Sequence, residues 1–63
     1  MSDFRLSNQG TISVLWALTE AARAWSEEHL PADRTLWCGG TVIEHRFVND
    51  IADGIRADGL TIN

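Results

Sequence analysis

The sequence contains no lysine, one cysteine and one proline among its 63 residues. The single cysteine, Cys38, excludes an internal disulfide, so an apolar core or self-association has to hold the fold together. All five basic residues are arginines, and they are scattered along a chain of net charge −4. Because proteins that bind duplex nucleic acid usually present a clustered basic stripe, we expect no duplex nucleic acid as a partner.

Long apolar runs are also missing. The longest, Val14 to Leu18, is far shorter than the roughly 20 residues that cross a bilayer. Met1 to Leu6 are of mixed polarity and do not form the apolar stretch of a signal peptide. We therefore expect no membrane association and a cytoplasmic location, in which Cys38 stays reduced.

Motifs for metal, nucleotide and covalent chemistry are absent from the sequence as well. His29, Cys38, Glu44 and His45 are of the right types to bind metal, but they form no C-x-x-C or H-x-x-x-H pair. Gly39-Gly40 belongs to no phosphate-binding motif. Glu44 and His45 are neighbours on an expected strand, so their side chains would point to opposite faces. We predict no catalytic residue, no metal, no cofactor and no small-molecule substrate; the protein is not an enzyme.

What is present is a regular succession of strand and helix patterns. The expected elements are a hairpin formed by 4–6 and 11–18 around the turn residues 7–10, a helix over 20–30, a strand segment over 35–43, a helix from about 46 to 58, and a last short strand over 60–62. Thr19 is the expected N-cap of the first helix, which Pro31 ends, and Gly59 is expected to end the second.

This β-β-α-β-α-β order predicts an α+β fold, with 1–63 as a single domain. We expect a small four-stranded mixed or antiparallel sheet with both helices on one face. The sequence leaves open whether Gly39-Gly40 makes a bulge, a bend or a tight turn between two short strands. Cys38 is expected to be a small buried residue in a strand.

The second strand is apolar on one face and half apolar on the other. The wholly apolar face is predicted to belong to the core, and it comprises Ile12, Val14, Trp16 and Leu18. The opposite face carries Ser13, Leu15 and Ala17.

If both helices cover the first of these faces, the second is open. Leu15 would then lie on it together with Trp37, and large apolar residues on an open sheet face are seldom left wet. We predict that Leu15 and Trp37 bind a partner there. Asp50 and Asp53 on the second helix are predicted to add an acidic docking surface.

The pattern resembles a family of small uncharacterised proteins of proteobacteria and bacteriophages. The likeness is carried by Phe4-Arg5-Leu6, Asn8, Gly10, Leu18-Thr19, Ala22, Trp25, Glu28-His29-Leu30-Pro31, Trp37, Gly39-Gly40, Val42, Glu44, Asp50-Ile51, Gly54 and Asp58-Gly59-Leu60. It implies one intact domain and supplies no catalytic residues. A phage-like origin favours binding to a host complex, as anti-defence proteins such as anti-CRISPRs do.

Three functions follow as hypotheses. The leading one is a non-enzymatic protein-binding module, with a host protein as its partner. The first alternative is a structural homodimer. The second is a weak binder of single-stranded nucleic acid that uses Trp37 with a groove formed from Arg5, Arg34 and Arg46.

Overall fold

Two antiparallel strands begin the fold in the computed structural model, which describes residues 2–63. Strand β1 (Phe4–Gln9) pairs with β2 (Ile12–Ala17) along its whole length. Gly10 takes a positive φ of 84° in the connecting turn, and its N–H donates to the side-chain oxygen of Asn8. The predicted hairpin is thus confirmed, with a shorter turn than predicted: residues 7–9 belong to β1, and the turn is formed by Gly10 and Thr11.

Helix α1 (Glu20–His29) begins and ends close to where the sequence predicts. The Thr19 hydroxyl accepts a hydrogen bond of 3.1 Å from the Ala22 N–H, which makes Thr19 the N-cap. Leu30 is the C-cap, in extended conformation, as is usual for a residue that precedes proline.

The segment that follows folds into a second hairpin. It consists of β3 (Leu36–Trp37) and β4 (Gly40–Glu44), joined by a turn in which Cys38 and Gly39 have φ of 51° and 81°. Two positive φ angles in succession are typical of the tight turns that join strands of a hairpin. Of the alternatives that the sequence left open, the tight turn between two short strands is the correct one: Gly39 lies in the turn and Gly40 is the first residue of β4. The prediction of a buried strand position for Cys38 is wrong, because Cys38 is exposed in this turn.

Helix α2 (His45–Ala57) follows β4 without a loop. At its end Gly59 has a φ of 81°, the Gly59 N–H donates to the Arg56 carbonyl, and the Leu60 N–H donates to the Ile55 carbonyl. This bonding pattern is the Schellman motif, and it confirms Gly59 as the predicted terminator.

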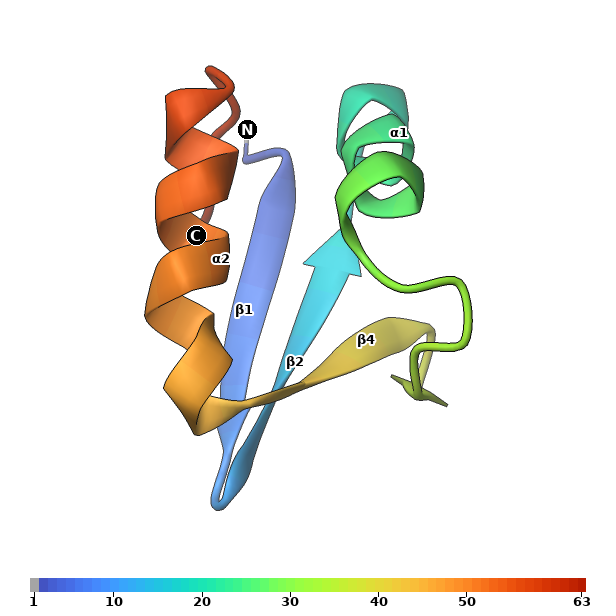
Figure 1. Ribbon diagram of the computed structural model, residues 1–63, viewed down its shortest axis with the longest axis vertical. Helices are drawn as coiled ribbons and strands as arrows, with labels where there is room; N and C mark the ends of the chain where they lie inside the picture. Colours follow the sequence, from blue (N-terminus) through green and yellow to red (C-terminus); the bar gives the residue numbers. More distant parts are fainter. Residues whose placement is uncertain (1) are drawn as a thin grey trace.

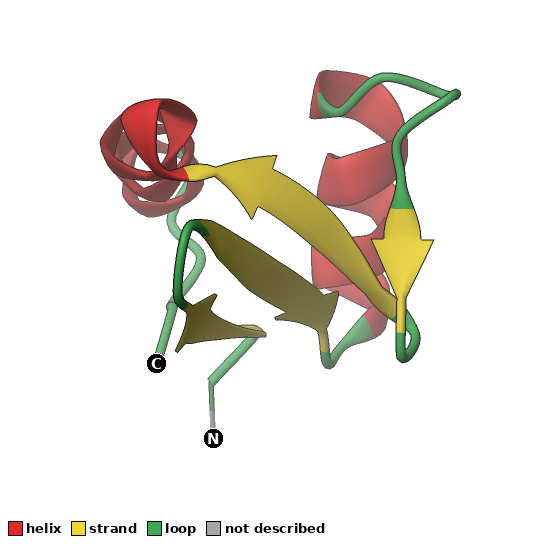
Figure 2. Ribbon diagram, turned by 90° about the horizontal axis from the view of Figure 1, so that it is seen from below, coloured by secondary structure: helices red, strands yellow, loops and turns green. Residues whose placement is uncertain are grey.

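The four strands form one antiparallel sheet in the order β1-β2-β4-β3. In Figure 1, β4 crosses below the helices, and Figure 2 shows both chain ends near the β1 side of the sheet. The predicted last strand is reduced to a single parallel bridge between Phe4 and Ile62. Side chains from α1 and α2 share one core with one face of the sheet, which confirms the predicted α+β architecture.

The face of β2 that enters this core is the opposite of the one predicted. Leu15 is 3% exposed and packs in a cluster with Phe4, Trp25, Ile43 and Ile55. The prediction that Leu15 lies on the open face and binds a partner is therefore wrong.

Residue size explains this choice of face. Ser13 and Ala17, on the same side of β2 as Leu15, are small. Small residues leave room for the large side chains that the helices bring, such as Trp25, whose ring meets Phe4 edge-on at 5.7 Å between centroids.

A network around Asp3 joins three parts of the chain. Its Oδ1 accepts a hydrogen bond from the Thr19 hydroxyl (2.8 Å), and its Oδ2 accepts one from the Thr61 N–H (3.0 Å). The Thr61 amide and the Thr19 hydroxyl hold the pKa of the Asp3 carboxyl below its ordinary value of 3.8. One carboxylate thus links the start of β1, the N-cap of α1 and the C-terminal segment.

Replacing Asp3 by asparagine is expected to lower the stability of the protein at neutral pH, because an amide nitrogen would then face the Thr61 N–H. A carboxyl with a lowered folded-state pKa stabilises the fold above its unfolded pKa and loses this effect as the pH falls through the folded value. The difference between D3N and the wild type should therefore shrink as the pH falls below 3.8.

Urea denaturation over a pH series measures this difference. Asp33→Asn is the matched control, since it removes the same charge from an exposed loop residue. A gap between D3N and the wild type that is as small as that of D33N, or that does not change with pH, would contradict the expectation.

Candidate functional site

The face of the sheet opposite the helices has its side chains in three rows. We call it the open face; it comprises Arg5, Ser7, Gln9, Ile12, Val14, Trp16, Trp37, Gly40, Val42 and Glu44. Side chains of paired residues in an antiparallel sheet point to the same side, so the strand register fixes this membership.

The first row crosses all four strands. Arg5 pairs with Trp16, the next position across is Gly40, and Gly40 pairs with Trp37. The second row is Ser7, Val14 and Val42, and the third is Gln9, Ile12 and Glu44. The open face therefore has an apolar centre and a polar margin.

The indole of Trp16 is fixed over the centre of the first row. Its Nε1–H donates a hydrogen bond of 2.9 Å to the Cys38 carbonyl in the β3–β4 turn. A Cβ atom at Gly40 would lie 2.4 Å from Val14 Cγ1 and 3.0 Å from the Trp16 ring. Gly40 is thus the residue that lets Val14 and Trp16 settle on the sheet, and Val14 is fully buried although no helix lies on its side.

Arg5 and Trp37 lie at the two ends of the first row. The Arg5 guanidinium carbon is 5.9 Å from the centre of the Trp16 ring, within the range of a cation–π contact. Trp37 is 49% exposed on β3, and Leu18, which continues the apolar alternation of β2, is 47% exposed. Arg5 forms no ion pair with any residue between 2 and 63.

The four predicted partner-binding residues lie in three different places. Trp37 is on the open face as predicted, and Leu15 is in the core. Asp50 and Asp53 are exposed on α2, as predicted, where Asp53 pairs with Arg56 at 3.7 Å. The acidic helix surface is therefore separate from the open face.

Arg5, Trp16 and Val42 are members of the open face that the sequence pattern did not predict. The signal that could have found them is the pair of small residues, Ser13 and Ala17, which marks the other face of β2 as the one that helices approach.

A second concave region lies between the helices. It is a groove of about 370 Å³, lined mainly by the apolar residues Leu30, Pro31, Ile43, Phe47 and Ile51, with Asp50 at its border. This volume is at the lower end of the range for small-molecule pockets.

The side chains considered as metal ligands or catalytic groups do not converge on one site. His29 stacks on Trp25 with 4.5 Å between ring centroids, and its Nε2 lies 3.4 Å from Asp58 Oδ2. Trp25 Nε1–H also donates to this carboxylate. Within residues 2–63, no group of three histidine, cysteine or carboxylate side chains could hold a metal ion.

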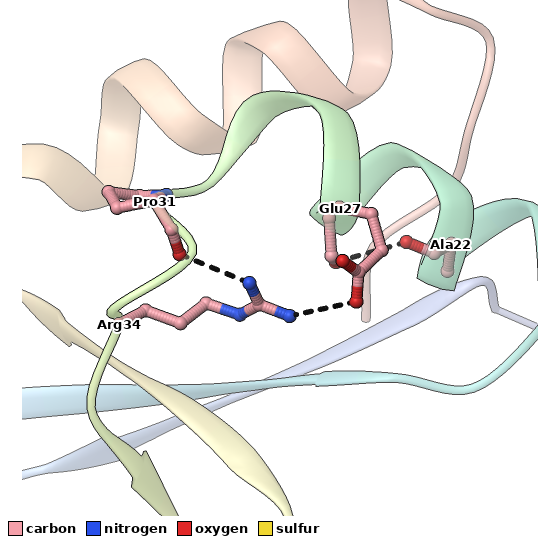
Figure 3. A network of polar contacts seen from close by, with 5 residues as sticks. Ala22, Glu27, Pro31 and Arg34 are labelled. Carbon is pink, nitrogen blue, oxygen red and sulfur yellow. Dashed lines mark hydrogen bonds and ion pairs between the residues drawn. The ribbon is translucent and has the colours of Figure 1, made fainter.

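The arginines expected to form a nucleic-acid groove are also dispersed. Arg34 points toward the C-terminal end of α1, and its guanidinium donates to Glu27 on this helix (3.4 Å) and to the Pro31 carbonyl in the loop that follows it (3.1 Å), as Figure 3 shows. Arg46 pairs with Glu44 at 3.2 Å. Arg5 is thus the member of the three that lies beside the tryptophans without a carboxylate partner among residues 2–63.

Comparisons with protein-family models, with curated proteins and with solved structures give no match for this chain. The resemblance to a family of phage and proteobacterial proteins stays a prediction. Neither of the two helices described in residues 2–63 has the length and apolar character needed to cross a membrane.

Gly40→Ala is expected to destabilise the protein by about 1–3 kcal/mol, because the added methyl group overlaps Val14 and Trp16 on the open face. Gly54→Ala is the matched control. In α2, a Cβ at this position has Trp25 as its nearest neighbour at 3.4 Å, so the substitution should raise stability by up to about 1 kcal/mol through helix propensity.

Denaturation with urea, followed by far-ultraviolet circular dichroism, measures both changes. Equal effects of the two substitutions would show that the packing of Val14 and Trp16 over Gly40 does not limit stability.

Proposed function

We propose that this protein is a non-enzymatic protein-binding module that contacts its partner through the open face. The observation that supports this most directly is the first row, in which a fixed Trp16 lies between Arg5 and a half-exposed Trp37. Tryptophan and arginine are the residues most enriched among those that dominate binding energy at protein interfaces.

The composition of the open face matches that of protein interfaces. Its accessible centre is apolar, with the half-buried Ile12, Trp16 and Val42 around the buried Val14, and its margin is formed by Ser7 and Gln9 together with charged residues. Protein interfaces have this arrangement of an apolar centre and a polar rim.

The indole of Trp16 is held in place before binding. The hydrogen bond from Trp16 to the Cys38 carbonyl holds the indole in one orientation, so little side-chain entropy is lost on contact. Covering the exposed half of Trp37 would remove roughly 120 Å² from water, equivalent to about 3 kcal/mol before the costs of association.

Single-stranded nucleic acid is the second candidate, because Trp16 and Trp37 could stack on bases while Arg5 contacts a phosphate. The charges favour protein instead. The chain has a net charge of −4, and Arg34 and Arg46 are engaged by Glu27 and Glu44. Binding to the phosphate backbone of a nucleic acid needs several unpaired arginine or lysine side chains along a groove.

Photo-crosslinking in cells tests the proposal. A photoreactive amino acid at position 37, on the open face, should give crosslinked protein adducts, and the same residue at position 28, on the outer side of α1, should not. Adducts with nucleic acid at position 37 would favour the second candidate. Equal protein adducts at both positions, or none at position 37, would reject the open face as the binding surface.

A further inference from the structure

We propose that the partner of the open face is a second copy of this chain, packed face to face in a two-fold dimer. This proposal rests on the proposed function, since it names the partner of the same surface.

The distribution of charge favours a second copy. Most of the acidic side chains lie on the helices or directly after them; they are Glu20, Glu27, Glu28, Asp50, Asp53 and Asp58. The open face instead carries Arg5 at one corner and Glu44, paired with Arg46, at the other. It is therefore a near-neutral part of an acidic molecule.

Stacking two open faces keeps the acidic surfaces apart. Packed sheets lie about 10 Å from each other, and each helical layer lies about 10 Å beyond its own sheet, so the two helical layers are about 30 Å apart. This separation is several times the Debye length of about 8 Å at physiological ionic strength. The net charge of −4 on each copy consequently opposes this dimer only weakly.

The size of the face also suits a dimer. The protein exposes 4239 Å² and measures 28 × 20 × 19 Å, so one side of this block-like molecule offers roughly a sixth of the surface, about 700 Å². Two such faces bury about 1,400 Å² in total, within the range of specific interfaces.

The corners of the face are complementary to each other. Arg5 lies in the first row on β1 and Glu44 in the third row on β4, and Val14 on β2 is the midpoint between them. A two-fold axis that runs above Val14, perpendicular to this diagonal, places Arg5 of each copy opposite Glu44 of the other. In a two-fold interface such a contact is made twice. The same axis places Trp16 of one copy opposite Val42 of the other.

Both charged side chains, Arg5 and Glu44, have hydrogen-bonding atoms available for this contact. Arg5 has no ion-pair partner within the described chain, residues 2–63, and Glu44 is bonded to Arg46 through Oε2, which leaves Oε1 free to accept. An arginine that faces a carboxylate can form two parallel hydrogen bonds with it, and this geometry makes the pair directional.

Size-exclusion chromatography with light scattering, over a concentration series up to about 200 µM, tests the dimer; this range brackets a weak specific complex. We expect the wild type to reach about twice its 7.0 kDa mass. Arg5→Glu and Glu44→Arg should each weaken the dimer at least tenfold, and the double variant R5E/E44R should restore it. Glu28→Arg, which changes charge by the same amount on the outside of α1, should not weaken it.

A wild-type protein that stays monomeric throughout this range overturns the proposal without relying on any variant. A dimer that R5E and E28R affect equally, or that R5E/E44R fails to restore, overturns the face-to-face arrangement. Far-ultraviolet circular dichroism verifies that each variant is folded. If the protein is monomeric while position 37 still crosslinks to another protein, the proposed function stands and the second copy is rejected.

Discussion

Strand β2 carries large apolar side chains on both of its faces, Leu15 on one and Val14 and Trp16 on the other, and this constraint governs the rest of the structure. Residues 2–63 form two helices, and the apolar residues of these helices meet the sheet on the face of Leu15. Neither of these helices covers the opposite face, and the side chains of Val14 and Trp16 pack there against the sheet itself. This packing depends on Gly40, whose missing side chain admits Val14, and on the Trp16 hydrogen bond to the β3–β4 turn. A second, thin apolar layer results, with Trp37 half exposed at its edge.

This second layer connects stability with function. A 63-residue domain buries a modest fraction of its surface and has a small margin of stability. Apolar residues that a larger protein would cover with more chain therefore remain available for a partner. The same row that completes the packing of the sheet, from Arg5 to Trp37, is the row that carries the binding proposal. The proposed second copy would cover these apolar residues without bringing the acidic helices close together.

Local signals predicted the elements well. Thr19 caps α1, Gly10 and Gly59 take the positive φ angles expected of them, and Pro31 follows the end of α1. These features depend on neighbouring residues, so a sequence pattern is enough to find them. The assignment of Leu15 failed because alternation fixes which residues share a face, but not which face the helices approach. Cys38 was misplaced because a hairpin turn can hold a non-glycine residue at positive φ.

The sequence by itself determined which segments form the first hairpin and the two helices, the residues that cap α1 and end α2, the acidic character of the chain and the presence of large apolar residues on both faces of β2. The tertiary structure decided which of these faces became the core and which residues, led by Trp16 and Trp37, were left to form the open face. The physical reason is that local conformation depends on short-range sterics and hydrogen bonds. The choice of face depends on how side chains from distant segments, such as Trp25 and Ile55, fill the space above small residues.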